Sequence, residues 1–179
     1  MALSFAGNGT IAGLSVGGLP DGCIASADIA SGVIPAGGKM LQCLNAVTNT
    51  TGSTTSTSFI DSPLTLAITP SATSSKILVL TSFYFGGVHN TQYGTHVGLF
   101  RDSTQLSTDI VTGHDSANYS GDAGQAASFS YLDSPSSTSS LTFKLKYKTE
   151  STTAYFNKGT SGTHWGQGTS SITLMEISA

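Results

Sequence analysis

The stretch Lys76–Phe85, KILVLTSFYF, decides the fold of this chain. Successive side chains of a β-strand point to opposite faces, so a strand with one face in water alternates apolar and polar residues. In this stretch both alternating sets of positions hold apolar side chains. We therefore expect 76–85 to be either a central strand of a sheet or a strand covered by another subunit.

The segments around this stretch alternate as strands that bury one face. Every second residue of 64–69 is leucine or isoleucine, and apolar residues alternate with Thr142 and three lysines in 141–148. Clusters of serine, threonine and proline at 69–75 and 133–140 indicate turns. The expected strands are 40–48, 57–61, 64–69, 76–85, 95–101, 105–112, 125–132, 140–149, 152–157 and 171–177. They predict an all-β chain, an antiparallel β-sandwich of jelly-roll type.

The composition agrees with strands and excludes several function classes. The 179 residues include 28 serines and 25 threonines but only two glutamates and one arginine, so long helices are disfavoured. Charged residues make up 9% of the chain, against about 25% in a typical protein. With a net charge of −3 there is no basic stripe to neutralise phosphates, and we expect no binding of nucleic acid.

Residues 1–38 differ in composition from the rest of the chain. They are rich in glycine and offer only isolated apolar pairs such as Val33-Ile34, so they cannot close a core of their own. We therefore expect an extended arm at 1–38 and a sandwich head at 39–179. The chain begins without the charged and then apolar layout of a secretory leader, which predicts folding in a cytoplasm and free thiols at Cys23 and Cys43.

No constellation in the sequence specifies catalysis. If the stretch between His89 and His96 is a hairpin loop, the two imidazoles would face each other and could share a metal, but a third ligand, at His114-Asp115, is available only if the fold brings that loop near. The acidic residues mostly sit beside Ser, Gly or Asn, where turn formation explains them, and no nucleophile elbow occurs. We expect no enzyme activity, no cofactor and no bound metal.

Aromatic residues on expected loops are the candidates for binding. A ring in a loop can stack on a sugar or anchor a protein contact; the alternative is that each ring caps the core beneath its loop. The loops concerned are 88–95, 113–124 and 158–170. The candidate contact residues are Tyr93, Tyr119, Trp165, His89, His96 and His164.

Several motifs along the chain resemble bacteriophage tail-fibre-like proteins, especially those of marine phages and cyanophages. They are Gly18–Ile24 (GLPDGCI), Ala27–Ile34 (ADIASGVI), Leu64–Ser71 (LTLAITPS), Ser74–Val79 (SSKILV), Leu99–Thr104 (LFRDST) and Ile172–Ile177 (ITLMEI). The resemblance covers nearly the whole chain, and its motifs are structural rather than catalytic. The absence of a long shaft favours a short fibre.

The resemblance implies a homotrimer on a phage virion, made in the host cytoplasm. Its arm would attach to another tail, baseplate or capsid protein, and its head would bind a bacterial surface glycan or outer-membrane protein. The candidates for virion attachment are Leu14, Val16, Leu19, Ile24 and Ile29. The candidates for the trimer axis are Leu78, Leu80, Phe83 and Phe85. The alternative function is a capsid decoration or head-fibre protein with a purely structural role.

Overall fold

The computed structural model describes residues 4–5, 11–12, 38–89, 94–108, 110–112, 121–151, 153–159 and 167–179. The chain divides into two units, Met1–Ala36 and Gly37–Ala179, close to the boundary expected after residue 38. In the first unit the described residues form two short antiparallel strands, β1 (Ser4–Phe5) and β2 (Ile11–Ala12). Among the residues that the structure describes, no helix is long and apolar enough to cross a membrane.

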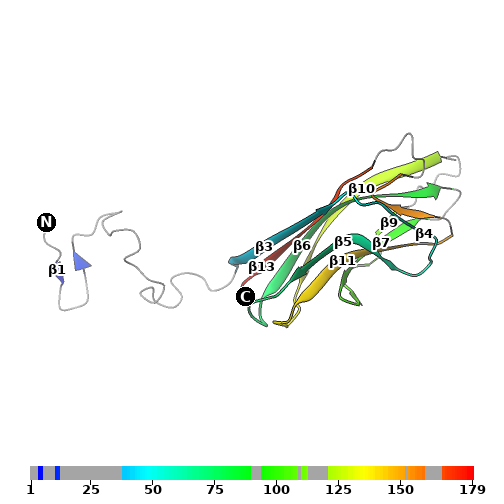
Figure 1. Cartoon of the computed structure of the whole chain (residues 1–179). Helices are drawn as coiled ribbons and strands as arrows, with labels where there is room; N and C mark the ends of the chain where they lie inside the picture. Colours follow the sequence, from blue (N-terminus) through cyan, green and yellow to red (C-terminus); the bar gives the residue numbers. More distant parts are fainter. Residues whose placement is uncertain are drawn as a thin grey trace. The chain divides into compact units, whose positions relative to one another are not determined.

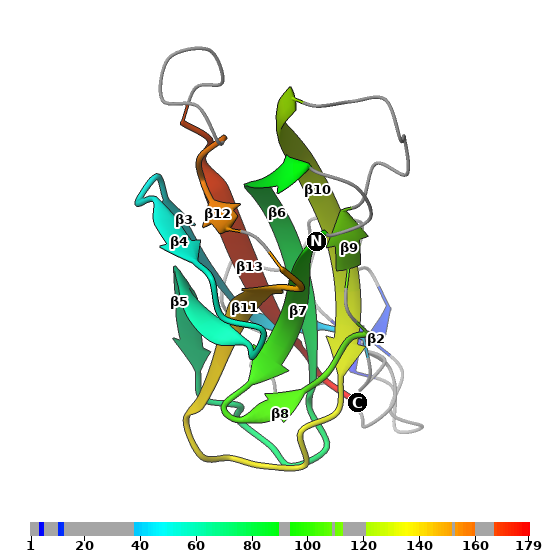
Figure 2. The same cartoon turned by 90° about the vertical axis from the view of Figure 1, so that its right-hand side faces the viewer.

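The second unit is an all-β head made of two antiparallel sheets, shown in Figures 1 and 2. The large sheet has the order β3-β13-β6-β12-β4, and β10 pairs with the other edge of β6. The small sheet has the order β5-β11-β7-β8, and β9 also pairs with β7. The large sheet contains β3 (Met40–Thr48), β4 (Gly52–Thr54), β6 (Lys76–His89), β10 (Gly121–Asp133), β12 (Ala154–Phe156) and β13 (Ser170–Ile177). The small sheet contains β5 (Ile60–Ile68), β7 (Thr95–Arg101), β8 (Thr104–Gln105), β9 (Ile110–Thr112) and β11 (Leu141–Thr149).

The expectation of an all-β head with antiparallel sheets is confirmed, although some strand limits differ. Residues 60–61 of the expected strand 57–61 and residues 64–68 of the expected strand 64–69 belong to one strand, β5, in which Pro63 lies where the register to β11 shifts between Lys144 and Lys146. Proline is tolerated at such a bulge on an edge strand because no ladder hydrogen bond is lost. The expected strand 105–112 is two short strands, β8 and β9, and β4 lies in a threonine-serine tract that shows no apolar alternation.

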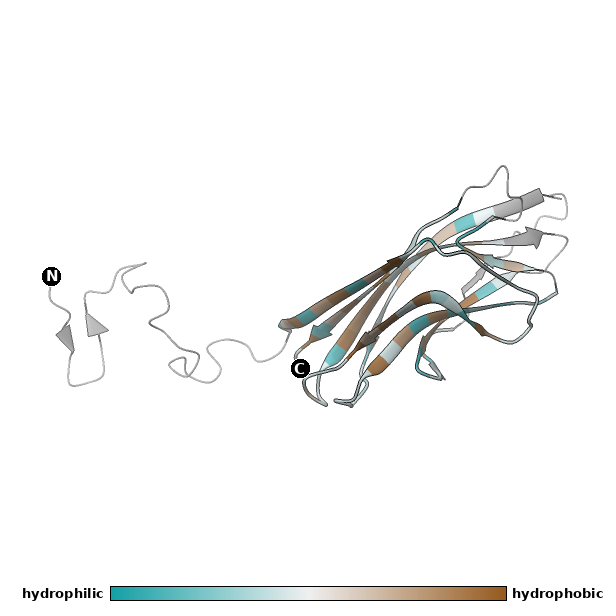
Figure 3. Cartoon of the chain, in the orientation of Figure 1, coloured by the Kyte–Doolittle hydropathy of each residue, from teal (hydrophilic) through white to brown (hydrophobic). Residues whose placement is uncertain are grey.

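Strand β6 is central in the large sheet. On one edge it pairs with β10 from Ile77 to His89, and on the other edge with β13 and then with β12. Its odd-numbered residues from Ile77 to Phe85 are buried in the sandwich. Its even-numbered residues point to the outer face, where Leu80 is 37% exposed. Figure 3 shows the resulting alternation of apolar and polar residues along the strands.

The division of β6 into an inward and an outward side shows that two of the four residues predicted for the trimer axis are wrong. Phe83 and Phe85 are each 1% exposed and contact one another, with ring centroids 5.4 Å apart. They belong to the core of the single chain and cannot line an axis between chains. Leu78 and Leu80 lie on the opposite, outward side of the same strand.

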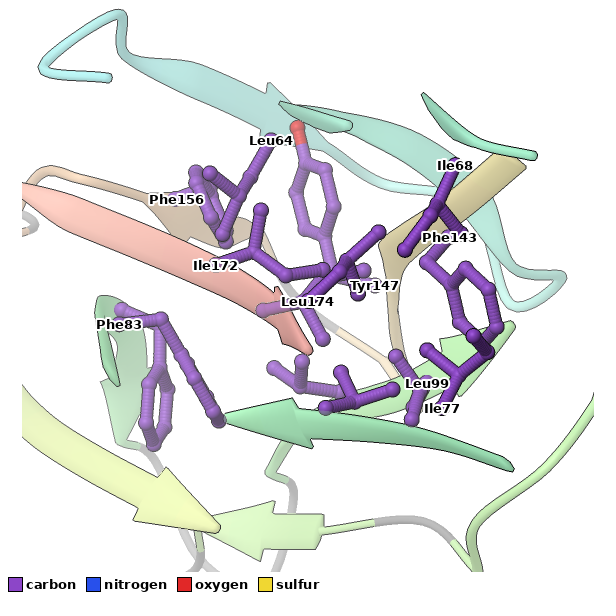
Figure 4. Packing of buried hydrophobic residues seen from close by; sticks show 14 of the residues in the cluster. Leu64, Ile68, Ile77, Phe83, Leu99, Phe143, Tyr147, Phe156, Ile172 and Leu174 are labelled. Carbon is purple, nitrogen blue, oxygen red and sulfur yellow. The ribbon is translucent and has the colours of Figure 1, made fainter. Parts of the chain in front are cut away.

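The core fills the space between the two sheets (Figure 4). The large sheet contributes β6 together with Ile172 and Leu174 of β13, and the small sheet contributes the apolar face of β11. Phe143 and Leu145 are fully buried, and the ring centroids of Tyr147 and Phe156 lie 5.8 Å apart. Burial raises the pKa of Tyr147. The predicted division of 141–148 into an apolar and a polar face is therefore confirmed.

A buried carboxylate closes the end of the sandwich where the chain ends. Glu176 of β13 is 0% exposed; its Oε1 accepts hydrogen bonds from the backbone N–H (2.7 Å) and the hydroxyl (2.6 Å) of Ser71. Its Oε2 accepts one from Nε2 of Gln42 at 2.6 Å. Burial alone would raise the pKa of Glu176, but these hydrogen bonds favour the charged form and lower it to about 2, from an ordinary value of 4.5.

Because the pKa is lowered on folding, the contribution of Glu176 to stability is present above pH 4.5 and is lost as the pH falls toward 2. We expect Glu176→Gln to lower the free energy of unfolding at pH 7 by about 1–3 kcal/mol, since charge-assisted hydrogen bonds are lost. The difference from the parent protein should shrink with acidification. Urea unfolding at a series of pH values measures it, and a difference that stays constant down to pH 2 would contradict the role of this carboxylate.

Candidate functional site

The strand ends that flank two loops of the sequence meet at one end of the head, and the flanks of a third loop are bound along the same half of β6. His89, the last residue of β6, pairs with Gly121, the first residue of β10. In the small sheet Thr95, the first residue of β7, pairs with Thr112, the last residue of β9, and donates its hydroxyl to the carbonyl of Gly86 (2.9 Å). The segments 90–93 and 113–120 therefore both start and finish at this end, which we call the tip (Figure 2).

The third segment, 160–166, is flanked by residues bound to the same half of β6. Lys158 and Gln167 form an isolated antiparallel bridge on either side of it. Next to this bridge the N–H of Asn157 donates to the carbonyl of Tyr84, and the N–H of Gly168 donates to the carbonyl of Asn157. A Cβ at Gly168 would lie only 2.3 Å from the Cβ of Tyr84, so this close approach requires glycine.

The arm joins the head at the end opposite the tip. The N–H of Gly38 donates to the carbonyl of Ser178 at 2.8 Å, and the N–H of Ser178 donates to the carbonyl of Lys39. These residues lie beside the first residues of β3 and the last of β13, next to Lys76, where β6 begins. Figure 1 shows both the start of β3 and the C-terminus at this end.

Four of the six predicted contact residues lie outside the described residues. His89 lies at the tip as the last residue of β6, but its side chain is not described. The predicted contacts outside the described residues are Tyr93, Tyr119, His164 and Trp165. The virion-attachment candidates Leu14, Val16, Leu19, Ile24 and Ile29 also lie outside them.

His96 differs from its prediction as a loop contact. It lies within β7, is 8% exposed, and its Nε2 lies 2.9 Å from Oε1 of Glu150. The stretch between His89 and His96 is not a hairpin loop, because β6 and β7 belong to different sheets. His96 is therefore part of the head's own packing and is withdrawn as a receptor contact.

A polar node built on Asn157 and Ser170 fixes the base of the segment 160–166. Asn157 is fully buried with φ of 54°, and its Nδ2 donates to the carbonyls of Thr48 (3.0 Å) and Thr50 (3.1 Å). Its Oδ1 accepts from the hydroxyl of Ser170 at 2.5 Å, and that hydroxyl accepts from the N–H of Tyr84 at 3.1 Å. The node joins β3, β6 and β13, which are distant in sequence, and no local pattern predicts it.

The outer face of the small sheet carries the largest group of charges in the described head. Lys144 and Lys146 contact the two carboxylate oxygens of Asp61 at 2.8 and 3.1 Å. The hydrogen bond from Lys144, followed by that from Lys146, lowers the pKa of Asp61 despite the opposing effect of burial. The ammonium of Lys146 also lies 5.0 Å from the ring centroid of Phe100. The charges of Lys144, Lys146 and Asp61 are therefore paired with one another on a solvent-facing surface.

This outer face also holds a small aromatic cluster that the sequence does not reveal. The rings of Phe59 and Phe100 meet edge to face at 5.2 Å, and the ammonium of Lys148 lies 4.5 Å from the centroid of Phe59. Phe100 is 7% exposed, so it offers no open platform for a sugar ring. We assign this cluster to the packing of the 55–59 segment against the small sheet.

Within the described ranges, no group of three or more His, Cys, Asp or Glu residues is placed to hold a metal ion. No protein-family model matches the sequence, and no curated protein matches it. The tip, defined by the chain segments that flank 90–93, 113–120 and 160–166, is the candidate functional site because these flanks share one half of β6.

The node at Asn157 gives a stability prediction with a built-in control. Asn157→Gly removes the side-chain hydrogen bonds but tolerates the positive φ, so we expect a loss of about 1–3 kcal/mol in the free energy of unfolding. Asn157→Ala loses the same bonds and adds the strain of a left-handed backbone, about 1 kcal/mol more. Thermal and urea unfolding compare the two variants. Equal stability of both with the parent protein would show that the node does not hold the tip segment.

Proposed function

We propose that this protein is a bacteriophage virion protein, a short tail fibre that binds the host surface through its tip and attaches to the particle through its arm. The observation that carries the proposal is the polarity of the head. The arm joins at Gly38, beside Ser178, whereas the strand ends around 90–93 and 113–120 lie at the other end of β6 and the flanks of 160–166 are bound beside Tyr84 in that half of the strand. An adhesive fibre needs its anchor and its contact surface at opposite ends, and this head has that arrangement.

The order of the strands supports a jelly roll. Going along the chain, β3, β5, β6, β7, β10, β11 and β13 alternate between the two sheets. The long strands follow the orders β3-β13-β6-β10 and β5-β11-β7 with β9 outermost. Two interleaved four-stranded sheets of this kind are typical of viral capsid and lectin domains. Because one fold hosts many functions, this likeness favours a virion or adhesion role without specifying a ligand.

Adhesion also fits the chemistry of the loops. Segments 90–93, 113–120 and 160–166 hold Tyr93, Tyr119 and Trp165 among small and hydroxyl residues. Aromatic rings supply contact area at low conformational cost, and serine, glycine and asparagine supply adaptable hydrogen bonds. We propose that the partner at the tip is a bacterial surface glycan or an outer-membrane protein, and that the protein acts by binding rather than by catalysis.

The proposal includes a homotrimer, in which weak contacts at three tips act together. Linked binding modules raise the effective concentration of each second contact, so avidity exceeds the affinity of a single tip. The arm, with Leu14, Val16, Leu19, Ile24 and Ile29 as its apolar contacts, would bind a tail, baseplate or capsid protein. If the tip binds no cell, the same architecture serves as a capsid decoration or head fibre.

The test is adsorption of fluorescently labelled, purified protein to a panel of candidate host bacteria. We expect saturable binding to some strains and a loss of about tenfold or more with Trp165→Ala, because loss of an aromatic anchor at a contact centre commonly costs 2 kcal/mol or more. Thr65→Ala is the matched control, since Thr65 is exposed on the outer face of the small sheet, away from the tip. Circular dichroism checks that both variants fold.

Two outcomes would overturn the adhesive role. Binding that Trp165→Ala, Tyr93→Ala and Tyr119→Ala all leave unchanged would remove the tip as the contact surface. Absence of binding to every strain that the parent phage infects would favour the decoration protein.

A further inference from the structure

Exposed apolar side chains gather on the outer face of the large sheet. All five large apolar residues that are exposed in the described chain belong to strands of this sheet. Val47 of β3 is 61% exposed, Leu132 of β10 is 51% exposed and Leu80 of β6 is 37% exposed; Met40 and Leu41 lie at the start of β3. Grouping of such residues on one sheet marks an interaction surface, whereas single exposed apolar residues need no explanation.

The pairing register places apolar side chains side by side across this face. Cys43 of β3 is opposite Met175 of β13, Met175 is opposite Leu78 of β6, and Leu78 is opposite Leu132 of β10. One row therefore crosses four strands without a polar side chain. We call this row, with Leu80 and Val47 above it, the apolar face.

The two rows of side chains that contain Leu80 and Val47 carry no charge either. Leu80 lies in a row with Asn45, Thr173 and Ser130, and Val47 lies in a row with Ser171, Ser82 and Ser128. None of the side chains in these three rows carries a charge. The nearest charge along β6 is Lys76, at the end where the arm joins.

The two outer faces of the sandwich thus differ in electrostatics. The small sheet presents Lys144, Lys146 and Lys148 with Asp61 between the first two, a net positive charge that would repel the same face of another copy. The apolar face has no charge to repel its own copy, and it lacks the basic residues with which a protein attracts anionic lipid or nucleic acid. Subunit interfaces bring equivalent surfaces close to a symmetry axis, so a neutral, apolar surface fits a second copy of itself.

We propose that the apolar face is the interface between copies of this chain, with Leu78, Leu80 and Leu132 at its centre. The inference rests on the self-association included in the proposed function and names the surface that makes it. The chain enters the head at β3, the strand at the edge of this face, at the end of β6 opposite His89. The apolar face and the described strand ends at the tip are made of different residues.

The experiment measures the mass of the full-length protein by light scattering on a sizing column over a range of concentrations. We expect the parent protein to run at a multiple of its 18.2 kDa chain mass. Leu80→Asp should shift it toward the monomer and weaken association by about 100-fold or more, because a carboxylate would be desolvated in the contact. Leu132→Asp, on the neighbouring strand, should do the same.

The matched control is Thr65→Asp, which adds the same charge to the outer face of the small sheet and should leave the mass unchanged. Circular dichroism confirms folding of each variant. A monomeric parent protein, or Leu80→Asp and Leu132→Asp proteins that assemble like Thr65→Asp, would overturn the interface. Assembly without adsorption to any host would leave the interface standing and remove only the adhesive function.

Discussion

A central strand must find hydrogen-bond partners along both edges, and β6 imposes this requirement on the whole head. It has 14 residues, and neither of the two strands that pair with its second edge, β13 and β12, is long enough to cover that edge alone. β10 accompanies one edge, but on the other edge β13 extends only to Ser82 and β12 pairs from Phe85. The N–H and carbonyl of Tyr84 fall between these partners, and Ser170 and Asn157 satisfy them. An unpaired backbone group at this depth would cost about as much as a lost hydrogen bond.

The two sides of β6 have different roles. Its odd-numbered residues fill the core with Ile77, Val79, Phe83 and Phe85, and its even-numbered residues include Leu78 and Leu80 on the apolar face. One stretch of sequence therefore stabilises the single chain and supplies the surface for a second copy. In the proposed function, assembly at this face and adhesion at the tip involve separate residues, so a change in the loops can alter the ligand without disturbing the core.

The local sequence pattern predicts most of the strands, but not which strands pair or which face of a strand is buried. Strand 141–149 is foreseeable because apolar and polar residues alternate along it, and 40–48 and 95–101 are foreseeable as apolar runs between clusters of serine, threonine and glycine. The alternation of 76–85 left open which side faces the core, because both sides are apolar, and for this reason Phe83 and Phe85 were assigned to an axis. The strand's inward side is fixed by pairing with residues about 50 and 90 positions away, as in Leu80↔Ser130 and Leu80↔Thr173. The node at Asn157 reaches Thr48, 109 residues earlier, and has no local signature.

Burial of the apolar face between copies can be tested most directly at Cys43, which lies in its row of apolar side chains and is exposed in the single chain. The measurement is the rate at which a thiol reagent modifies Cys43 in a Cys23→Ser background, at rising protein concentration. The account predicts that modification slows by about tenfold or more as the protein assembles, since access limits thiol reaction, and that Leu80→Asp restores the fast rate. A rate that is fast and independent of concentration would contradict it.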